Sequence, residues 1–286
     1  MKVVCTEKSQ ILGSKVAKAL DLPLVYSQFK AFPDGELYLK TGTLDGETLL
    51  VSSTAENQSL VQLLLMIDAC EESDITLVLP YMGYARQDKC FNDGEPVSSR
   101  AVARALSTGV SRVITVNIHE SSVLSHFRVP AVDISLAPEM ARWVAGLGCD
   151  EPLILAPDKG AAVFAAQIAK HGGWETDHLS KTRLSDEEVR IAPSSVDARG
   201  RDIVITDDII STGGTLATAA GMLKDGGARS VHAACVHGVF ASGGFARLAA
   251  AGLASVAASD TIESAASAYS AAGMIAEAVR KHNGRS

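Results

Sequence analysis

Cysteines are few and scattered in this chain of 286 residues. The five of them stand at positions 5, 70, 90, 149 and 235, an odd number without CxxC spacing. This pattern indicates neither a disulfide framework nor a zinc site, and free thiols suit a reducing compartment. No apolar stretch reaches the roughly 18 to 20 residues that a membrane-spanning helix needs. We therefore expect a soluble, cytoplasmic protein with no membrane segment.

Aromatic residues and positive charge are also scarce. Phe, Trp and Tyr together make up 5% of the chain, and the formal net charge is −7. A surface that binds nucleic acid needs an excess of Lys and Arg, so we expect no nucleic-acid partner. Hydrophobic residues make up 47%, mostly Ala, Val, Leu and Ile, which is typical of parallel β-sheets covered by helices on both faces. A chain of this length has room for two such α/β domains.

The most informative stretch covers residues 202 to 216, with the sequence DIVITDDIISTGGTL. It predicts a buried strand over 203–205 that ends in two adjacent carboxylates, Asp207 and Asp208. A turn rich in hydroxyls and glycines follows and opens a helix. Backbone N–H groups and the positive end of a helix dipole favour a bound phosphate at such a turn. The candidate phosphate-binding residues are Ser211, Thr212, Gly213, Gly214 and Thr215.

A missing lysine narrows the choice of ligand for this stretch. The GxxxxGK[ST] loop that binds nucleotide triphosphates carries a lysine that is absent here. Two carboxylates beside a phosphate repel it unless they face sugar hydroxyls or a divalent cation. A ribose with one phosphate therefore fits the stretch better than a nucleotide triphosphate. The alternative is an ordinary strand-to-helix turn, for which Asp, Ser, Thr and Gly are the usual residues.

The first half of the chain alternates predicted strands and helices. Asp45-Gly46 is a strong hairpin signal, so we expect the strand at 48–53 to return antiparallel to the strand that contains Leu37 and Leu39. The other predicted strands are 3–4, 75–80, 112–118 and a short one around 132. The predicted helices are 11–20, 57–72 with an apolar stripe of Leu60, Leu63, Leu64 and Ile67, 98–107 capped by Ser98, 120–126 and 138–147.

Two features of this half contain residues that could bind a ligand. The polar segment YMGYARQDKCFNDGEPVS (81–98) follows the strand at 75–80, and ligands of open α/β sheets bind at the carboxyl ends of strands. Its aromatic, guanidinium and amide groups could stack on a base and hold phosphates, or it could be a solvated charged loop. His119 follows the strand at 112–118, but a lone histidine in this position is more often structural than a metal ligand.

The second half begins again with a predicted strand at 153–155, followed by Asp158 and a helix at 161–170. The segment from 178 to 192 is charged and hairpin-like, and it places Lys181 and Arg183 on one face if it is extended. By itself this segment is typical of an exposed hairpin. Gly146, Gly148 and residues 150–152 suggest a linker, so we expect domains at 1–147 and 148–286. The remaining predicted elements are a helix to about 225, a strand at 229–238, a helix at 245–250, a strand at 254–257 and an alanine-rich helix after Thr261.

Taken in order, the motifs of the chain resemble the ribose-phosphate pyrophosphokinases, also called phosphoribosyl pyrophosphate synthetases, in their short archaeal form. These motifs are FPDGE (32–36), LLMIDAC (64–70), PYMGYARQDK (80–89), NIHE (117–120), APDKGA (156–161), KTR (181–183), TDDIISTGGT (206–215) and SDTI (259–262). The resemblance implies two phosphoribosyltransferase-like α/β domains, each a mainly parallel sheet flanked by helices. It also implies that the pyrophosphoryl group of ATP is transferred to the C1 hydroxyl of ribose 5-phosphate, with Mg²⁺ as cofactor. The products would be phosphoribosyl pyrophosphate and AMP.

The same resemblance implies roles for single residues and a homo-oligomer, because part of each ATP site would come from a neighbouring subunit. Ribose 5-phosphate would bind to Asp207, Asp208, Ser211, Thr212, Gly213, Gly214 and Thr215. ATP would bind to Arg86, Gln87, Asp88 and His119, and to Phe32, Asp34 and Glu36 of the neighbouring subunit. Metal would bind to His119 and Asp158, and Lys181 and Arg183 would be catalytic residues of a mobile loop.

Two other functions remain open. A phosphoribosyltransferase, which consumes phosphoribosyl pyrophosphate, would share the loop at 206–215 but would not need YARQDK or the segment around Lys181. A non-catalytic regulatory subunit of a synthetase would be expected to lose the catalytic-loop residues, and this chain retains both Lys181 and Arg183.

Overall fold

The computed structural model describes residues 1–183, 189–193, 197–282 and 284, with the backbone alone described at 181–183 and 189–193. The chain forms two compact units. Unit 1 contains Met1–Ser135, Asp260–Glu263 and Ser270–Ser286, and unit 2 contains Leu136–Ser259 and Ser264–Tyr269. The units thus divide before the boundary expected after residue 147, and the chain returns to unit 1 twice near its end.

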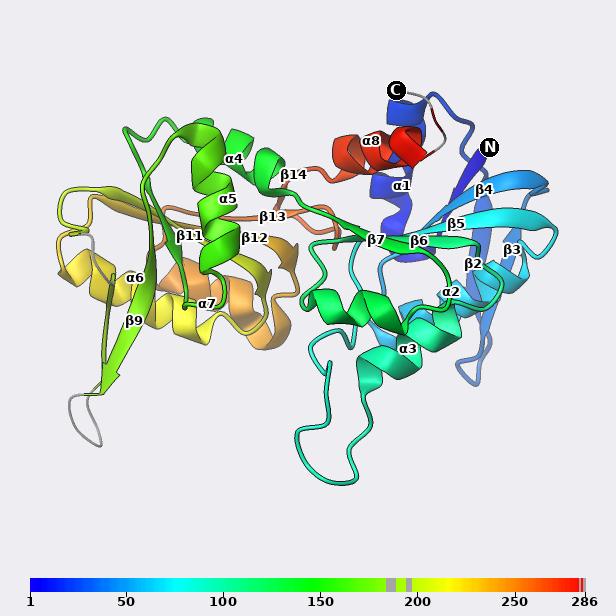
Figure 1. The fold of residues 1–286 in the computed structure, drawn as a ribbon, viewed down its shortest axis with the longest axis horizontal. Coiled ribbons are helices and arrows are strands. Elements are labelled where there is room, and N and C mark those ends of the chain that lie inside the picture. Colours follow the sequence, from blue (N-terminus) through cyan, green and yellow to red (C-terminus); the bar gives the residue numbers. More distant parts are fainter. Residues whose placement is uncertain (184–188, 194–196, 283, 285–286) are drawn as a thin grey trace. The chain divides into compact units, whose positions relative to one another are not determined.

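Unit 1 is built on a five-stranded parallel sheet with the order β1-β4-β5-β6-β7. Helices cover both faces of this sheet, α1 and α8 on one face and α2 and α3 on the other (Figure 1). The strands are β1 (Lys2–Cys5), β4 (Gly46–Val51), β5 (Ser73–Leu79), β6 (Arg112–Val116) and β7 (Ala131–Ile134). The helices are η1 (Glu7–Ser9), α1 (Gln10–Leu20), α2 (Asn57–Asp68), α3 (Ser98–Leu106), η2 (Ser121–His126) and α8 (Ala272–His282).

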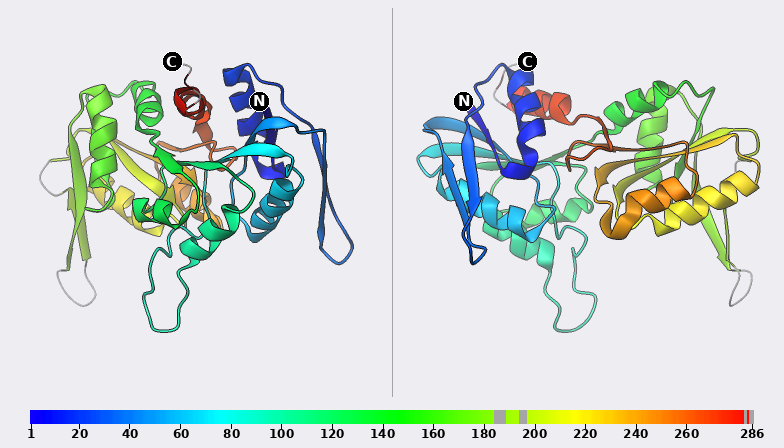
Figure 2. Two further views of the ribbon diagram at one scale, coloured as in Figure 1. Left: turned by 45° about the vertical axis from the view of Figure 1, so that its right-hand side comes forward. Right: turned by 180° about the vertical axis from the view of Figure 1, so that it is seen from behind.

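The hairpin predicted from Asp45-Gly46 is wrong. β3 (Leu37–Thr41) pairs antiparallel with β2 (Ser27–Ala31) around the turn at Pro33, and these two strands form a separate sheet that projects beyond the five-stranded one (Figure 2). β4 instead pairs parallel with both β1 and β5. The physical reason is burial: Leu49, Leu50 and Val51 are completely buried, and only an inner strand of a sheet covered on both faces can bury consecutive side chains.

The core of unit 1 lies between the sheet and the α2–α3 layer. Leu63 and Ile67 of α2 pack there as predicted, together with strand residues such as Leu50 and Leu77. Leu64, which belongs to the predicted stripe, is 39% exposed, and Met66 is buried in addition to Leu63 and Ile67. The predicted helix therefore exists, but its buried face is rotated relative to the predicted one.

Unit 2 contains a seven-stranded sheet with the order β10-β9-β8-β11-β12-β13-β14. β9 and β10 pair antiparallel, as the charged hairpin predicts, and the other neighbours pair parallel. α4 and α5 lie on one face of this sheet and α6 and α7 on the other (Figure 1). The strands are β8 (Leu153–Ala156), β9 (Thr176–Arg183), β10 (Val189–Pro193), β11 (Asp202–Ile210), β12 (Ser230–Gly238), β13 (Ser255–Ser259) and β14 (Ser267–Tyr269). The helices are α4 (Ala137–Ala145), α5 (Ala162–Gly172), α6 (Gly214–Asp225), η3 (Ala241–Gly243) and α7 (Gly244–Ala250).

The end of the chain differs from the expected alanine-rich helix after Thr261. Residues 260–263 belong to unit 1, β14 adds an edge strand to the sheet of unit 2, and the helix begins only at Ala272. That helix, α8, packs against α1 of unit 1. In the described part of the chain, no helix combines the length and the apolar character that crossing a membrane requires.

The strand order of unit 2 identifies where a ligand could bind. From β8 the chain passes through α5 to β9 on one side, whereas β11 lies on the other side of β8 and leads through α6 to β12. Such a reversal opens a crevice at the carboxyl ends of the two central strands, which is the usual ligand site of open α/β sheets. In unit 2 this point lies just beyond β8 and β11.

Candidate functional site

The acidic pair lies at this reversal point, on a strand that is longer than predicted. The sequence predicts a strand that ends in these two carboxylates, but β11 continues past both of them to Ile210. β12 runs alongside that extension, pairing Asp207 with Cys235 and Ile210 with Gly238, whereas β8 has already ended at Ala156. The pair therefore sits on the part of β11 that extends past its shorter neighbour.

The surroundings of Asp207 disfavour the negative charge of its carboxylate. Burial raises the pKa of its carboxyl to about 8, and the neighbouring Asp208 and, more weakly, Asp158 add to the effect. The backbone N–H of Asp208 donates a hydrogen bond to Oδ1 of Asp207 (2.9 Å), which favours the charged form but offsets only part of the effect of burial. A ligand with hydroxyl donors or positive charge would therefore relieve the unfavourable burial of this carboxyl.

The turn after the strand leads into the start of α6. Gly213 has a φ of +69° and stands at the N-cap position of α6, where a side chain would be strained. A Cβ at Gly214 would meet no atom within 4 Å, so the space beside this residue is open. Ser211 is half-buried, while Thr212 and Thr215 are exposed at the same turn. Free N–H groups of a first helical turn bind phosphate.

Arg247 and Gly244 support this turn, and the sequence analysis missed both. A guanidinium nitrogen (Nη1) of Arg247 in α7 donates a hydrogen bond to the backbone carbonyl of Thr212. A Cβ at Gly244 would lie 2.5 Å from the carbonyl oxygen of Ser211, so the start of α7 can approach the turn only as glycine. An arginine in an alanine-rich segment gives no sequence signal for this role, because the contact joins elements far apart in the chain.

Asp158 lies just beyond β8, at the same edge of the sheet. One carboxylate oxygen, Oδ1, accepts hydrogen bonds from the backbone N–H groups of Gly160 (2.8 Å) and Ala161 (3.1 Å). These bonds hold the carboxylate at the strand end, and its side chain is exposed. The fold thus brings together three carboxylates, Asp158, Asp207 and Asp208, beside the helix start.

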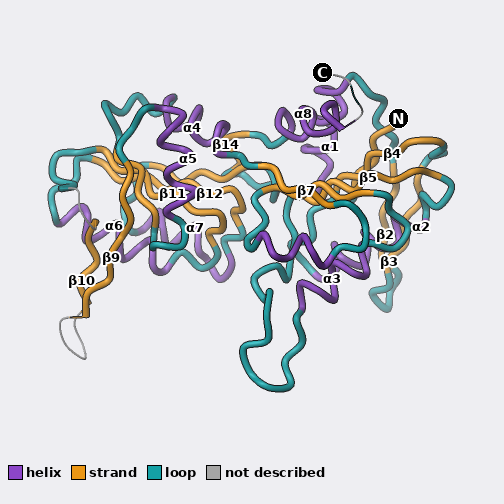
Figure 3. Tube along the Cα trace, in the orientation of Figure 1, coloured by secondary structure: helices purple, strands orange, loops and turns teal. Residues whose placement is uncertain are grey.

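In unit 1, the polar segment after β5 forms a long loop between β5 and α3 (Figure 3). Arg86 is exposed, and Gln87 and Asp88 are half-buried. Ser98 does not cap α3: Val97 stands at the N-cap position, and the Ser98 hydroxyl donates to the side-chain oxygen of Gln87. The sequence predicts a cap because serine is common there, but in the fold the side chain fixes a candidate ATP-binding residue instead.

His119 follows β6, the neighbouring strand of the same sheet, and is exposed. The backbone before it turns sharply, with a φ of +41° at Asn117. Asp133 of β7 stabilises that turn, because its carboxylate accepts hydrogen bonds from the N–H of Ile118 (3.0 Å) and the hydroxyl of Thr115 (2.6 Å). No sequence motif marks Asp133 for this role.

The remaining predicted residues lie on two hairpins. Phe32, Asp34 and Glu36 surround the tip of the β2–β3 hairpin, where the Phe32 ring is 51% exposed and packs edge-on against Tyr38 at 6.1 Å. Lys181 and Arg183 lie on β9, opposite Ile191 and Val189 of β10, and their side chains are outside the described part of the structure. Their predicted roles stay predictions.

Comparisons with known proteins cover both units. Residues 1–109 match the family profile of the N-terminal domain of ribose phosphate pyrophosphokinase, and residues 136–250 match that of the phosphoribosyl transferase domain. The ribose-phosphate pyrophosphokinase of Methanosarcina acetivorans is 44% identical over 284 residues, which is 98% of this chain and 100% of that protein. The ribose-phosphate pyrophosphokinase of Methanosarcina mazei is 45% identical over 98% of this chain and 95% of its own length.

The chain belongs to the ribose-phosphate pyrophosphokinase family. The fold agrees: a crystal structure of phosphoribosylpyrophosphate synthetase from Mycobacterium smegmatis superposes with a TM-score of 0.86 at 28% identity, over 100% of this chain and 99% of that one. The predicted fold class, two phosphoribosyltransferase-related domains with parallel sheets flanked by helices, is confirmed. As a member of the ribose-phosphate pyrophosphokinases, the chain is an enzyme of the ribose-phosphate diphosphokinase class.

The two predicted metal ligands of this ribose-phosphate pyrophosphokinase lie in different units, His119 in unit 1 and Asp158 in unit 2. Across the residues that the structure describes, no group of three or more His, Cys, Asp or Glu side chains is arranged to hold a metal ion. A closed protein cage for a metal is therefore not part of the described structure. A cation held by one carboxylate together with substrate phosphates needs no such cage.

Proposed function

We propose that the chain transfers the β,γ-pyrophosphoryl group of ATP to the C1 hydroxyl of ribose 5-phosphate, giving phosphoribosyl pyrophosphate and AMP. The observation that carries this proposal is the position of Asp207 and Asp208 directly before the open start of α6, at the strand reversal of unit 2. A sugar phosphate needs both parts, hydroxyl acceptors and an anion site, in this order. Family membership supports the same reaction.

Ribose 5-phosphate would bind with its 5-phosphate at the first turn of α6. The backbone N–H groups of 213–215 and the hydroxyls of Ser211, Thr212 and Thr215 are the available donors. The ribose hydroxyls would donate hydrogen bonds to Asp207 and Asp208. Because burial and like charge raise the pKa of Asp207, hydroxyl donors relieve an unfavourable arrangement in the free site, and this favours a sugar over a second anion.

ATP would bind in unit 1, at the loop that contains Arg86, Gln87 and Asp88. A planar guanidinium can hold phosphate oxygens or stack on adenine, and the hydrogen bond from Ser98 fixes the side-chain amide of Gln87. The exposed tip of the β2–β3 hairpin, with Phe32, Asp34 and Glu36, would complete the adenine site of a neighbouring subunit. The active form would therefore be a homodimer or a larger homo-oligomer.

Mg²⁺ would be held by Asp158, with His119 near the nucleotide phosphates. The donor chemistry of Asp158 fits: it is an exposed carboxylate whose Oδ1 is fixed by two backbone N–H groups, and Mg²⁺ is usually bound by one or two carboxylates and substrate phosphates. An imidazole is a less typical Mg²⁺ ligand than a carboxylate, so His119 suits a phosphate contact better. Bound Mg²⁺ would neutralise phosphate charge during the transfer.

The chemical step forms a bond between the C1 oxygen and the β-phosphorus of ATP and breaks the bond from that phosphorus to the oxygen it shares with the α-phosphorus. AMP leaves with that oxygen, and the proton of the C1 hydroxyl is lost. Such a transfer mainly requires alignment and compensation of the charge on the phosphate oxygens. Lys181 and Arg183 of the β9–β10 hairpin would provide this positive charge, and loop closure would exclude water.

The test is an incubation of the protein with ATP, ribose 5-phosphate and Mg²⁺, followed by chromatographic measurement of AMP and phosphoribosyl pyrophosphate. We expect equal amounts of both products, dependent on both substrates and abolished by chelation of Mg²⁺. Asp208→Asn should lower kcat/KM for ribose 5-phosphate about 30- to 100-fold, because it removes a charged hydrogen-bond acceptor. Asp225→Asn, an exposed aspartate at the end of α6, is the matched control and should leave kcat/KM unchanged.

Absence of AMP from folded protein would refute the proposed reaction. Release of pyrophosphate from phosphoribosyl pyrophosphate that depends on an added base would instead identify a phosphoribosyltransferase. A protein that makes neither product but changes the rate of an active synthetase would be a regulatory subunit.

A further inference from the structure

The base of the loop between β5 and α3 is fixed by Ser53 and Thr54, which lie shortly after β4. The N–H of Tyr81 donates to the hydroxyl oxygen of Ser53 (3.2 Å), and the N–H of Gly83 donates to the hydroxyl oxygen of Thr54 (2.9 Å). The backbone of Thr54 completes the contact, since its N–H donates to the carbonyl of Tyr81 (2.9 Å). The approach is close, because a Cβ at Gly83 would lie 2.2 Å from the carbonyl oxygen of Thr54.

Ser53 also contacts a segment from the far end of the chain. Its hydroxyl donates a hydrogen bond to the carbonyl oxygen of Thr261. Thr261 belongs to residues Asp260–Glu263, here called the anchor segment, which is part of unit 1 although the residues before and after it belong to unit 2. Ser53 and Thr261 are 3% and 1% exposed, so water does not compete for this contact.

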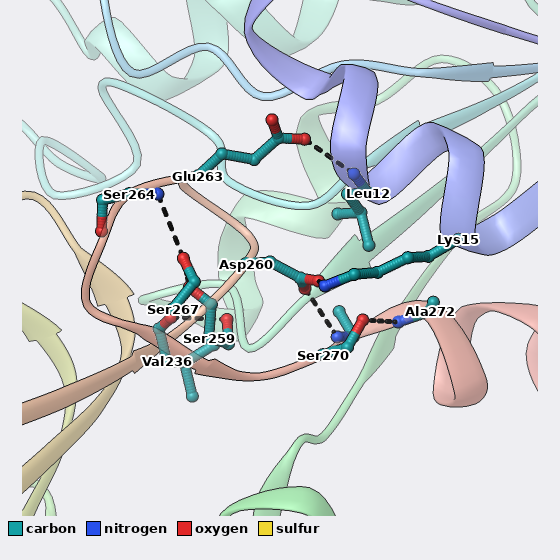
Figure 4. Close-up of polar contacts among 11 residues, drawn as sticks. Leu12, Lys15, Val236, Ser259, Asp260, Glu263, Ser264, Ser267, Ser270 and Ala272 are labelled. Atoms are coloured by element: carbon teal, nitrogen blue, oxygen red, sulfur yellow. Dashed lines mark hydrogen bonds and ion pairs between the residues drawn. The ribbon is translucent and has the colours of Figure 1, made fainter.

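The anchor segment is itself held at both ends (Figure 4). Asp260 is 1% exposed; its carboxylate accepts a hydrogen bond from the N–H of Ala271 (2.8 Å) and forms an ion pair with Lys15 of α1 (2.7 Å). At the other end, the carboxylate of Glu263 accepts a hydrogen bond from the N–H of Leu12 (2.7 Å), in the first turn of α1. A negative charge is favourable at a helix N-terminus. These contacts fix the carbonyl to which Ser53 donates.

One hydroxyl therefore joins the anchor segment to Tyr81, near the start of the loop that contains Arg86, Gln87 and Asp88. When Ser53 donates its proton to Thr261, a lone pair of its oxygen is left for the N–H of Tyr81. The hydrogen bond to the Thr261 carbonyl thus fixes the direction from which the Ser53 oxygen accepts the N–H of Tyr81. Loss of the Ser53 hydroxyl would remove both hydrogen bonds, each worth about 1 kcal/mol, from the base of the loop.

We propose that Ser53 is a positioning residue for ATP binding, and that the anchor segment Asp260–Glu263 orients its hydroxyl. This inference rests on the proposed function, because the loop that Ser53 holds is the proposed ATP loop. Neither Ser53 nor Thr261 needs to touch ATP. The loop enters the binding site at a position set by a stretch of chain that lies more than two hundred residues further on in the sequence.

The test compares Ser53→Ala with Ser107→Ala. Ser107 is a matched control in unit 1: it is also buried, its hydroxyl donates to a backbone carbonyl, that of Ala103 (2.7 Å), and it accepts from a backbone N–H, that of Arg128 (2.9 Å). The readouts are Kd for ATP by isothermal titration calorimetry without ribose 5-phosphate, KM for each substrate, and Tm. We expect Ser53→Ala to raise Kd and KM for ATP about tenfold, the effect of roughly one buried hydrogen bond.

KM for ribose 5-phosphate should stay within about twofold in Ser53→Ala, and Ser107→Ala should lower Tm by a similar amount while leaving Kd for ATP unchanged. An unchanged Kd for ATP in folded Ser53→Ala overturns the proposal, and so does an equal rise in Ser107→Ala. If Ser53→Ala does not fold, Asp260→Asn decides: it keeps the acceptor for Ala271 but loses the ion pair with Lys15. A rise of about threefold in Kd for ATP supports the proposal, and no rise overturns it.

The two proposals fail in different ways. Wild-type protein that binds ATP but forms no AMP refutes the proposed reaction, while the comparison of Ser53→Ala with Ser107→Ala still decides the role of Ser53. Wild-type protein that forms AMP, with the same Kd for ATP in Ser53→Ala, refutes the positioning role alone. Wild-type protein that does not bind ATP refutes both.

Discussion

Replacing Asp207 by Asn tests whether the proposed ribose 5-phosphate site is strained before a ligand arrives. Burial, Asp208 and Asp158 raise the pKa of Asp207 from its ordinary value of 3.8 to about 8. Below pH 4 the carboxyl is protonated in both the folded and the unfolded chain. Between pH 4 and pH 8 only the folded chain retains the proton, so the stabilisation present at low pH is lost as the pH rises through that window.

The size of the effect follows from the same numbers. The gap between 3.8 and about 8, at about 1.4 kcal/mol per pKa unit, sets a ceiling of about 6 kcal/mol on the change in unfolding free energy. Asp208 adds to the raised pKa of Asp207, so the two adjacent carboxyls titrate as an interacting pair and the observed change falls below this ceiling. We therefore expect about 2 to 3 kcal/mol between pH 5.5 and pH 8.5 in the wild-type protein.

Urea unfolding of the free protein at these two pH values measures the effect. Asp207→Asn keeps the size of the side chain but cannot titrate. Between pH 5.5 and pH 8.5, the unfolding free energy of the wild type should therefore fall by about 2 to 3 kcal/mol more than that of Asp207→Asn. Asp225→Asn, an exposed carboxylate in the same unit, should behave like the wild type. Equal pH dependence in wild type and Asp207→Asn would refute the reasoning.

Three further predictions concern other parts of the chain. Lys181→Ala should leave the Kd for both substrates nearly unchanged and slow kcat by about 10² to 10³, measured by single-turnover formation of AMP; an unchanged kcat would remove the lysine from the mechanism. Arg247→Gln should raise KM for ribose 5-phosphate about three- to tenfold with kcat little changed, since it loses the hydrogen bond to the Thr212 carbonyl; steady-state kinetics measures this, and an unchanged KM would contradict it. Leu49→Ala, at a completely buried position of β4, should cost about 2 to 5 kcal/mol in urea unfolding, against less than about 0.5 for Val132→Ala, which is 46% exposed on β7; equal losses would mean that β4 is not an inner strand.

Features that depend only on residues adjacent in the chain could be predicted from the sequence. The strand before Asp207, the glycine turn and the helix after it are adjacent in the chain, and the order of apolar, acidic and glycine residues is enough to predict them. The prediction for β4 failed because Asp45-Gly46 is a local hairpin signal, whereas pairing with β1 and β5 depends on how much apolar surface each arrangement buries. Ser98 is a similar case: its cap propensity is local, and its contact with Gln87 is not.

By itself, the sequence determined the α/β class, the position of the glycine turn between β11 and α6 and, through its ordered motifs, the family. Tertiary structure alone decided which distant side chains support those motifs. Arg247 holds the turn at Thr212, Asp133 fixes the backbone before His119, and the carbonyl of Thr261 orients Ser53. A motif is a run of neighbouring residues, and sequence patterns record it directly. A supporting hydrogen bond joins residues that only the packing of sheets and helices brings within 3 Å or so of each other, and no local pattern encodes that distance.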